Sequence, residues 1–129
     1  MKIITLSRLL LLVPLFFSLN AWSENSTSIP GYTIHHNAIS SASLDPAIAN
    51  QYGIQRSKYR GMLNVSVIKD VPNSTGKPVD ASVIANATNL RGQLISIPMR
   101  KVTEGEAIYY IGEFKIIDQE TLKFSLKVK

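Results

Sequence analysis

Residues 46–67, PAIANQYGIQRSKYRGMLNVSV, hold a helix end, three evenly spaced cations and a strand start with no gap between them. Asp45 and Pro46 are typical of a helix start, because the carboxylate caps free amide groups and proline suits the first helical position. Gly53 stands where a left-handed residue commonly ends a helix. The sequence therefore predicts a helix of about two turns, which packing must stabilise because so short a helix is marginal alone.

Three cations follow the predicted helix at every second position. Arg56, Lys58 and Arg60, here called the cationic ridge, would project to one side of an extended chain, roughly 6.6 Å from one another. Two interpretations remain open: a solvated strand edge that charge keeps soluble, or a ridge that accepts an anion. If Tyr52 and Tyr59 flank the ridge, they form with it a patch suited to a protein or glycan partner.

Residues 62–69 alternate between apolar and polar side chains, as expected for a strand with one buried face. Its apolar positions are Leu63, Val65 and Val67, and its polar positions are Asn64 and Ser66. Five more segments carry strand patterns with turn residues between them, namely residues 32–39, 79–87, 94–99, 107–117 and 121–129.

Particular residues refine this outline. Pro98 lacks an amide donor, which favours an edge or a bulge for its strand. Apolar side chains on both sides of segment 107–117 predict a central strand. Residues 24–29 are polar and are expected to form a frayed lead-in, while residues 71–78 are rich in turn formers and are expected to form a loop.

Six strands at short, regular spacing, with one short helix after the first, predict an all-β fold. The pattern is typical of an antiparallel immunoglobulin-like β-sandwich of about six or seven strands. A small barrel is the alternative architecture.

The N-terminus predicts export. Lys2 and Arg8 precede an apolar run at residues 9–17, which is about as long as a signal-peptide core and short for a permanent span. Ala21 and Ser23 are small residues at the positions that a signal peptidase reads. We therefore expect a signal peptide at residues 1–23, a single domain at residues 24–129 and a periplasmic location, with an uncleaved anchor as the alternative.

Composition excludes several classes of function. The chain has no cysteine, so thiol catalysis, iron–sulfur clusters, cysteine zinc sites and disulfides are all excluded. The formal net charge of +5 falls to about +3 when Lys2 and Arg8 leave with the signal peptide. So mild a balance gives no reason to expect a nucleic-acid partner.

His35 and His36 form the one histidine pair. Adjacent residues on a strand point to opposite faces, so both rings cannot easily hold one ion. We therefore expect no metal site, with one histidine in or near the core and the other in solvent.

A catalytic centre is not indicated either. No serine stands in a Gly-x-Ser-x-Gly elbow, and no glycine loop suited to phosphates is present. Paired carboxylates for glycoside chemistry would have to come from acids beside turns or on charged strand faces, namely Glu104, Glu106, Glu113, Asp118 and Glu120.

Almost the whole of residues 24–129 resembles a family of small exported proteins of Gram-negative bacteria that is known only as a domain of unknown function. The likeness lies in His35 and Ala38, in Tyr52-Gly53-Ile54 with Arg56-Ser57-Lys58, in Asn64 and Ser66, in Asn89-Leu90-x-Gly92-Gln93, and in Glu104-Gly105-x-Ala107-Ile108-Tyr109-Tyr110 with Glu113-Phe114. The resemblance implies a periplasmic immunoglobulin-like sandwich and supplies no catalytic or ligand residues.

These observations favour a non-catalytic interaction module of the cell envelope, with no cofactor and no permanent membrane span after cleavage. The alternative is a binder of an anionic small molecule or glycan, with Arg56, Lys58, Arg60, Tyr52 and Tyr59 as the candidate binding surface. A hydrolase is the least favoured reading. The pattern leaves the partner and the oligomeric state open.

Overall fold

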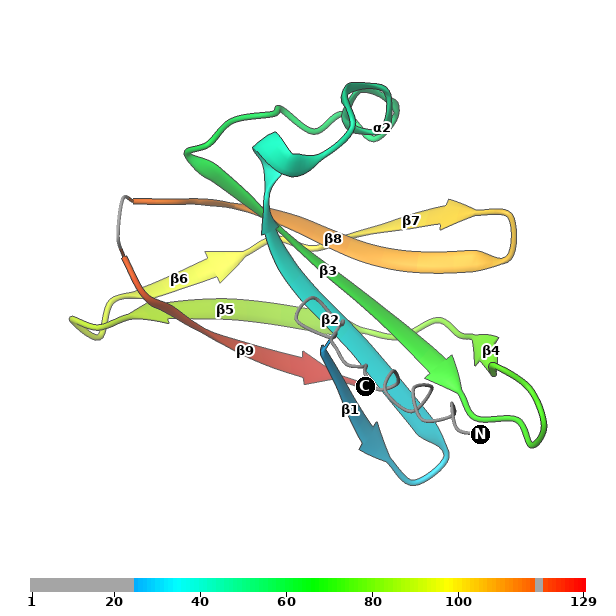
Figure 1. Cartoon of the computed structure of the whole chain (residues 1–129). Helices are drawn as coiled ribbons and strands as arrows, with labels where there is room; N and C mark the ends of the chain where they lie inside the picture. Colours follow the sequence, from blue (N-terminus) through cyan, green and yellow to red (C-terminus); the bar gives the residue numbers. More distant parts are fainter. Residues whose placement is uncertain (1–24, 118–119) are drawn as a thin grey trace, which may run out of the picture.

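The computed structural model of the chain describes residues 25–117 and 120–129. Two antiparallel sheets face one another (Figure 1). The strands are β1 (Asn25–Ile29), β2 (Tyr32–Ser40), β3 (Arg60–Lys69), β4 (Lys77–Pro78), β5 (Val83–Asn89), β6 (Leu94–Ile97), β7 (Arg100–Glu104), β8 (Ala107–Lys115) and β9 (Leu122–Val128); α2 spans Pro46–Gln51, and a 3-10 turn, η2, spans Ser41–Ser43.

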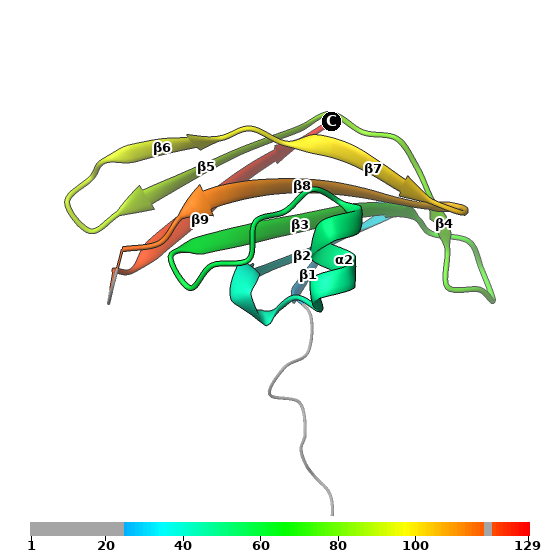
Figure 2. The same cartoon turned by 90° about the horizontal axis from the view of Figure 1, so that it is seen from above.

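The sheets differ in size. The large sheet has the order β1-β2-β3-β8-β7, with β4 also paired to β3, and the small sheet has the order β6-β5-β9. Figure 2 shows α2 on the face of the large sheet that points away from the small sheet. The predicted two-layer sandwich and its short helix are confirmed. The described residues contain nine strands, against about six or seven expected.

The additional strands arise from segments without the expected alternation. The predicted lead-in forms β1, which pairs with β2 through the turn at Pro30 and Gly31, and all five of its residues are exposed. The predicted loop contributes β4, and residues 100–104 form β7. Backbone pairing alone defines β1 and β4, so an apolar period could not reveal them.

Each predicted strand differs from the observed one by at least one residue at an end, and two of these differences affect the fold. The segment expected at 79–87 becomes a strand only at Val83, while its inward Ala85 and Ala87 are buried as expected. The segment expected at 94–99 ends at Ile97, and the chain then crosses at Pro98 from the small sheet to β7 in the large one. The edge position predicted from Pro98 is confirmed, because β6 lies at one edge of the small sheet. The proline itself stands where the chain changes sheets, not in a bulge.

The interior contains two apolar clusters. The first lies between the sheets and includes Val65 and Ala87, each with 0% exposure. Phe114 of β8 meets Phe124 of β9 edge to face, with ring centroids 5.1 Å apart. The second lies on the outer face of the large sheet beneath α2 and includes Ala49. The predicted central position of β8 is confirmed, because β8 lies between β3 and β7.

The predicted signal peptide, residues 1–23, and positions 118–119 of the last predicted turn lie outside the described residues. Within the described ranges, no helix is long and apolar enough to cross a membrane.

The crossing at Pro98 predicts the effect of a single methyl group. A Cβ added to Gly112 would lie 2.7 Å from the carbonyl oxygen of Pro98, and backbone cannot easily yield. Gly112→Ala should therefore lower the free energy of unfolding by about 1–3 kcal/mol in urea titrations. Ser125→Ala, an exposed change on β9, is the control and should leave it nearly unchanged; equal midpoints for the two variants would contradict the prediction.

Candidate functional site

The predicted helix start and stop are confirmed. The carboxylate of Asp45 accepts a hydrogen bond from the amide of Ala47 at 2.8 Å, and Gly53 has a left-handed φ of 68°. The guanidinium of Arg100 on β7 also donates to the carbonyl of Tyr52. The hydrogen bond from Arg100 holds Tyr52, the residue that follows α2, over the outer face of the large sheet.

The segment after α2 is a loop held by internal hydrogen bonds. Ser41, with 0% exposure, donates its hydroxyl to the carbonyl of Gln55 at 2.8 Å and accepts from the amide of Ser57 at 3.0 Å. Arg56 donates to the carbonyls of Leu44 and Ala42. The chain therefore loops from Ile54 to Tyr59 instead of continuing as an extended strand.

This loop overturns the geometry expected for the cationic ridge. Arg56 is engaged with main-chain carbonyls, while Lys58 lies 5.2 Å from the ring centre of Tyr59 in a turn. Arg60 lies at the start of β3 and forms an ion pair with Glu113 of β8 at 3.1 Å. The three cations thus have three separate environments, because a turn at Lys58 and Tyr59, closed by the hydrogen bond from the Arg60 amide to the Ser57 carbonyl, interrupts the chain between Arg56 and Arg60. A binding role for these residues stays a prediction.

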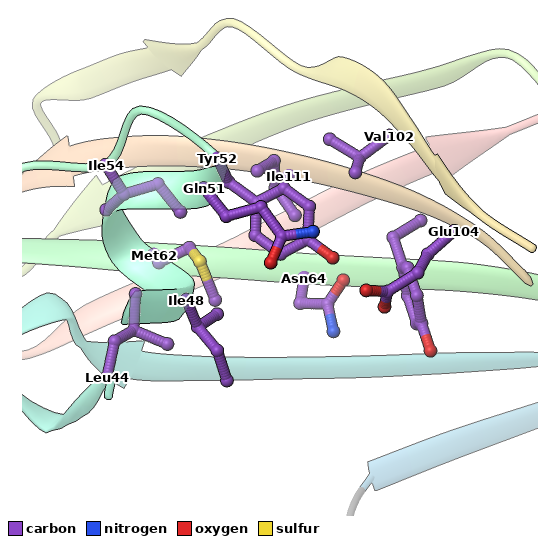
Figure 3. A pocket seen from close by; sticks show the side chains of 11 residues that line it. Leu44, Ile48, Gln51, Tyr52, Ile54, Met62, Asn64, Val102, Glu104 and Ile111 are labelled. Carbon is purple, nitrogen blue, oxygen red and sulfur yellow. The ribbon is translucent and has the colours of Figure 1, made fainter. Parts of the chain in front are cut away.

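A pocket of about 290 Å³ lies between α2 and the outer face of the large sheet, here called the outer pocket (Figure 3). Its walls are mostly apolar and come from α2, from the segments beside it, and from β3, β7 and β8. The lining residues are Leu44, Ile48, Gln51, Tyr52, Ile54, Met62, Asn64, Val102, Glu104, Tyr109 and Ile111.

Asn64 is the polar residue in the floor of this pocket. Figure 3 shows its side chain between Met62 and Glu104. Its Oδ1 is buried and has no hydrogen-bond partner among the described residues. An unpaired buried amide oxygen costs about 1–3 kcal/mol, so Asn64 lowers the stability of this face of the sheet and leaves a hydrogen-bond acceptor in the pocket.

Tyr52 and Glu104 meet at the opening of the pocket. Burial raises the pKa of Tyr52, and the hydrogen bond to the Glu104 carboxylate and its negative charge raise that pKa further. The phenol therefore stays protonated and donates toward Glu104. None of the ion pairs in the described part of the chain neutralises Glu104. The opening of the pocket consequently carries a negative charge and oxygen acceptors.

The histidines lie on opposite faces of β2, as the strand pattern predicts. His35 lies across from Ser66 on the outer face, and His36 across from Val65 on the inner face. Both are half-buried, so the expected contrast of one core and one solvent histidine is wrong. The described ranges contain no group of three or more histidine or acidic side chains placed to hold a metal ion.

Sequence reasoning identified Tyr52 but assigned it to the ridge, and it did not connect Asn64 and Glu104. The strand pattern gave no signal for this site, because Asn64 stands at a polar position of the alternation, as Ser66 does. Its neighbours in the outer pocket come from segments about 40 residues away in sequence, at Glu104 and Tyr109.

Comparison with known proteins places the chain. The family profile of DUF4426, a domain of unknown function, matches residues 26–129. The chain belongs to the DUF4426 family. This confirms the resemblance noted in the sequence. The chain is similar to a DUF4426 family protein from Pseudomonas aeruginosa PAO1 whose crystal structure is known. The two sequences are 36% identical, the match covers 82% of each chain, and the structures superpose with a TM-score of 0.70. No curated protein matches the chain.

The raised pKa of Tyr52 predicts an alkaline titration. The folded state favours the neutral phenol, so its contribution to stability is complete below the ordinary value of 10.0 and is lost as the pH rises through the raised pKa. Glu104→Gln should lower this pKa toward 10.0, because the hydrogen-bonded negative charge is removed while burial remains. Phenolate absorbance measures it, with Tyr52→Phe identifying the transition.

The control for this titration is Glu106→Gln, an exposed change in the same hairpin. It should leave the Tyr52 transition in place. A transition that Glu104→Gln does not move would show that the carboxylate has no influence on the phenol.

Asn64→Val should raise the free energy of unfolding by about 1 kcal/mol, because it removes the unpaired buried oxygen and places a β-branched residue in a strand. Asn37→Val is the matched control, since Asn37 pairs with Asn64 on the neighbouring strand and is exposed. Asn37→Val should gain only the stability that a β-branched residue gives a strand, because no buried unpaired oxygen is removed. Thermal unfolding measures both variants. An equal gain in the free energy of unfolding for the two would contradict the cost assigned to the unpaired oxygen of Asn64.

Proposed function

We propose that this chain is a non-catalytic binding protein of the bacterial periplasm, an interaction module of the cell envelope that holds an apolar group in the outer pocket. The observation that carries the proposal is the buried, unpaired Oδ1 of Asn64 in the floor of that pocket. Stability favours an apolar residue there, and a ligand that donates a hydrogen bond accounts for the amide.

The lining specifies the chemistry of the ligand. The walls favour an aliphatic or aromatic body, and about 290 Å³ suits a small molecule or one side chain of a partner. Asn64 Oδ1 and the Glu104 carboxylate are both acceptors. The group that fits is therefore apolar and ends in an N–H donor, with a cationic ammonium favoured by Glu104.

A binding role rather than a chemical one is supported by the kinds of polar group present. In the described chain the pocket is lined by amides, phenols and a single carboxylate, without a histidine, a serine or a second acid. Nucleophilic or paired-acid hydrolysis needs such groups together. The predicted signal peptide at residues 1–23 supports a periplasmic location.

The alternative from the sequence, an anionic ligand at the cationic ridge, has less support. Arg56 contacts main-chain carbonyls and Arg60 contacts Glu113, so within the described residues Lys58, which lies beside the ring of Tyr59, is the ridge cation without a hydrogen bond or ion pair. An anion would have to displace these internal contacts.

Calorimetry with three matched probes tests the proposal: n-hexylammonium, hexanoate and 1-hexanol. Hexylammonium should bind more tightly than hexanol, and hexanoate should not bind. Glu104→Gln should weaken hexylammonium binding by about tenfold, because a charge-assisted hydrogen bond is lost. Glu106→Gln, which removes the same charge outside the pocket, should leave the affinity unchanged.

Two outcomes would count against the outer pocket. One is hexanoate binding that Lys58→Glu abolishes, which would place the ligand at the ridge. The other is hexylammonium binding that survives both Glu104→Gln and Asn64→Leu.

A further inference from the structure

A second surface, separate from the outer pocket, lies along β9. The small sheet ends at β9, which pairs with β5 over all seven of its residues. In the described part of the chain, no strand pairs with the opposite edge of β9. Backbone groups of alternate residues point toward that edge, so it offers a row of N–H and C=O groups to an incoming strand.

A groove of about 540 Å³ lies beside this edge, here called the edge groove. One wall is β9, and the other is formed by β1 and the inner face of β2, the two strands by which the large sheet extends past β3 (Figure 1). The lining residues are Asn25, Thr27, Ile29, Ile34, His36, Asn37, Ala38, Leu63, Phe124, Leu126 and Val128.

Both walls leave interior-facing apolar side chains uncovered. Phe124 and Leu126 point inward from β9 but are only half-buried, whereas Ala85, on β5 opposite Leu126, is 1% exposed. On the other wall, Ala38 lies across from the buried Leu63 and is itself exposed. The small sheet therefore leaves part of the apolar inner surface of the sandwich uncovered beyond β9.

The outward face of β9 carries a distinctive charge pattern. Lys123 and Lys127 are exposed on either side of Ser125, and Lys129 follows them. Residues of a neighbouring strand would stand directly beside these side chains. Opposite charges in such cross-strand pairs are stabilising and like charges are destabilising, so this face selects an acidic neighbour.

The same pattern disfavours a second copy of this chain. Antiparallel pairing of two β9 edges about Ser125 would place Lys123 of each copy opposite Lys127 of the other. Such lysines protect an edge from self-association. The polar strand β1 of another copy would also lack the apolar residues that the groove requires, since residues 25–28 are Asn, Ser, Thr and Ser.

We infer that the edge groove is an acceptor site for an extended segment of another protein, in which apolar residues alternate with acidic ones. The segment adds a fourth strand to the small sheet at β9. Its main chain pairs with the free edge, its apolar residues cover Phe124 and Leu126, and its acidic residues lie beside Lys123 and Lys127.

Nine-residue peptides test the inference on the protein purified from an exporting host. In the first peptide valine alternates with glutamate, and in the second lysine replaces each glutamate. Fluorescence anisotropy should show binding of the glutamate peptide, at least about tenfold tighter than that of the lysine peptide. Amide hydrogen exchange should slow at residues 122–128 when the glutamate peptide is bound.

Backbone pairing has its own signature. Two further glutamate peptides carry N-methyl groups on the odd or on the even residues. A strand directs alternate amides to opposite edges, so one of these peptides should bind and the other should not. Equal binding of both would overturn strand addition.

A charge exchange separates specific pairing from general attraction. Changing both Lys123→Glu and Lys127→Glu should reverse the preference, so that the lysine peptide binds more tightly. The control is the double variant Lys69→Glu and Lys77→Glu, which changes the net charge equally at a cross-strand pair outside the groove. That variant should retain the original preference.

The inference is overturned if the glutamate peptide does not bind at millimolar concentration, if exchange slows elsewhere, or if both double variants shift the preference alike. It is also overturned if sedimentation shows a dimer of this chain whose protected amides are those of β9. Hexylammonium tests the outer pocket by calorimetry, whereas the peptides test the edge groove by anisotropy and hydrogen exchange. The proposed function and this inference can therefore fail independently.

Discussion

The pairing of β3 with its two long neighbours is the constraint on which the rest of the structure depends. β3 pairs with β2 over Gly61–Lys69 and with β8 over Arg60–Val65, so it is the axis of the large sheet. Its inward Val65 has 0% exposure and lies in the main core. This register settles which side chains of three strands face the interior, because a shift by one residue would invert every one of them.

The same alternation makes the outer face of β3 available for binding. Met62 and Asn64 point away from the core, and α2 covers Met62 while leaving Asn64 in the floor of the outer pocket. The edge groove has a different origin. It follows from the unequal width of the two sheets, because the small sheet ends at β9 while the large sheet continues through β2 to β1. One register thus supports two surfaces of distinct chemistry.

Local rules succeeded where side-chain period and burial agree. The alternation of Leu63, Val65 and Val67 predicted the buried face of β3, and the capping residue Asp45 located the start of α2. They failed in the loop 54–59, where the spacing of the cations suggested an extended chain. In the structure, the buried Ser41 hydroxyl donates to the carbonyl of Gln55 in the loop, and the Arg56 guanidinium donates from the loop to the carbonyl of Leu44. Those hydrogen bonds join segments about 15 residues apart, and no local pattern contains them.

The sequence by itself determined the all-β class, the helix boundaries and the faces of the long strands, because each rests on local propensity or on a period of two. The family followed from the matching residues along residues 24–129, not from either of these patterns. Only the tertiary structure decided that the chain changes sheets at Pro98, that Asn64 and Glu104 share a pocket, and that the small sheet stops at β9. These features depend on which distant segments pair. That choice is made by the total burial and hydrogen bonding of the folded chain, which no short stretch encodes.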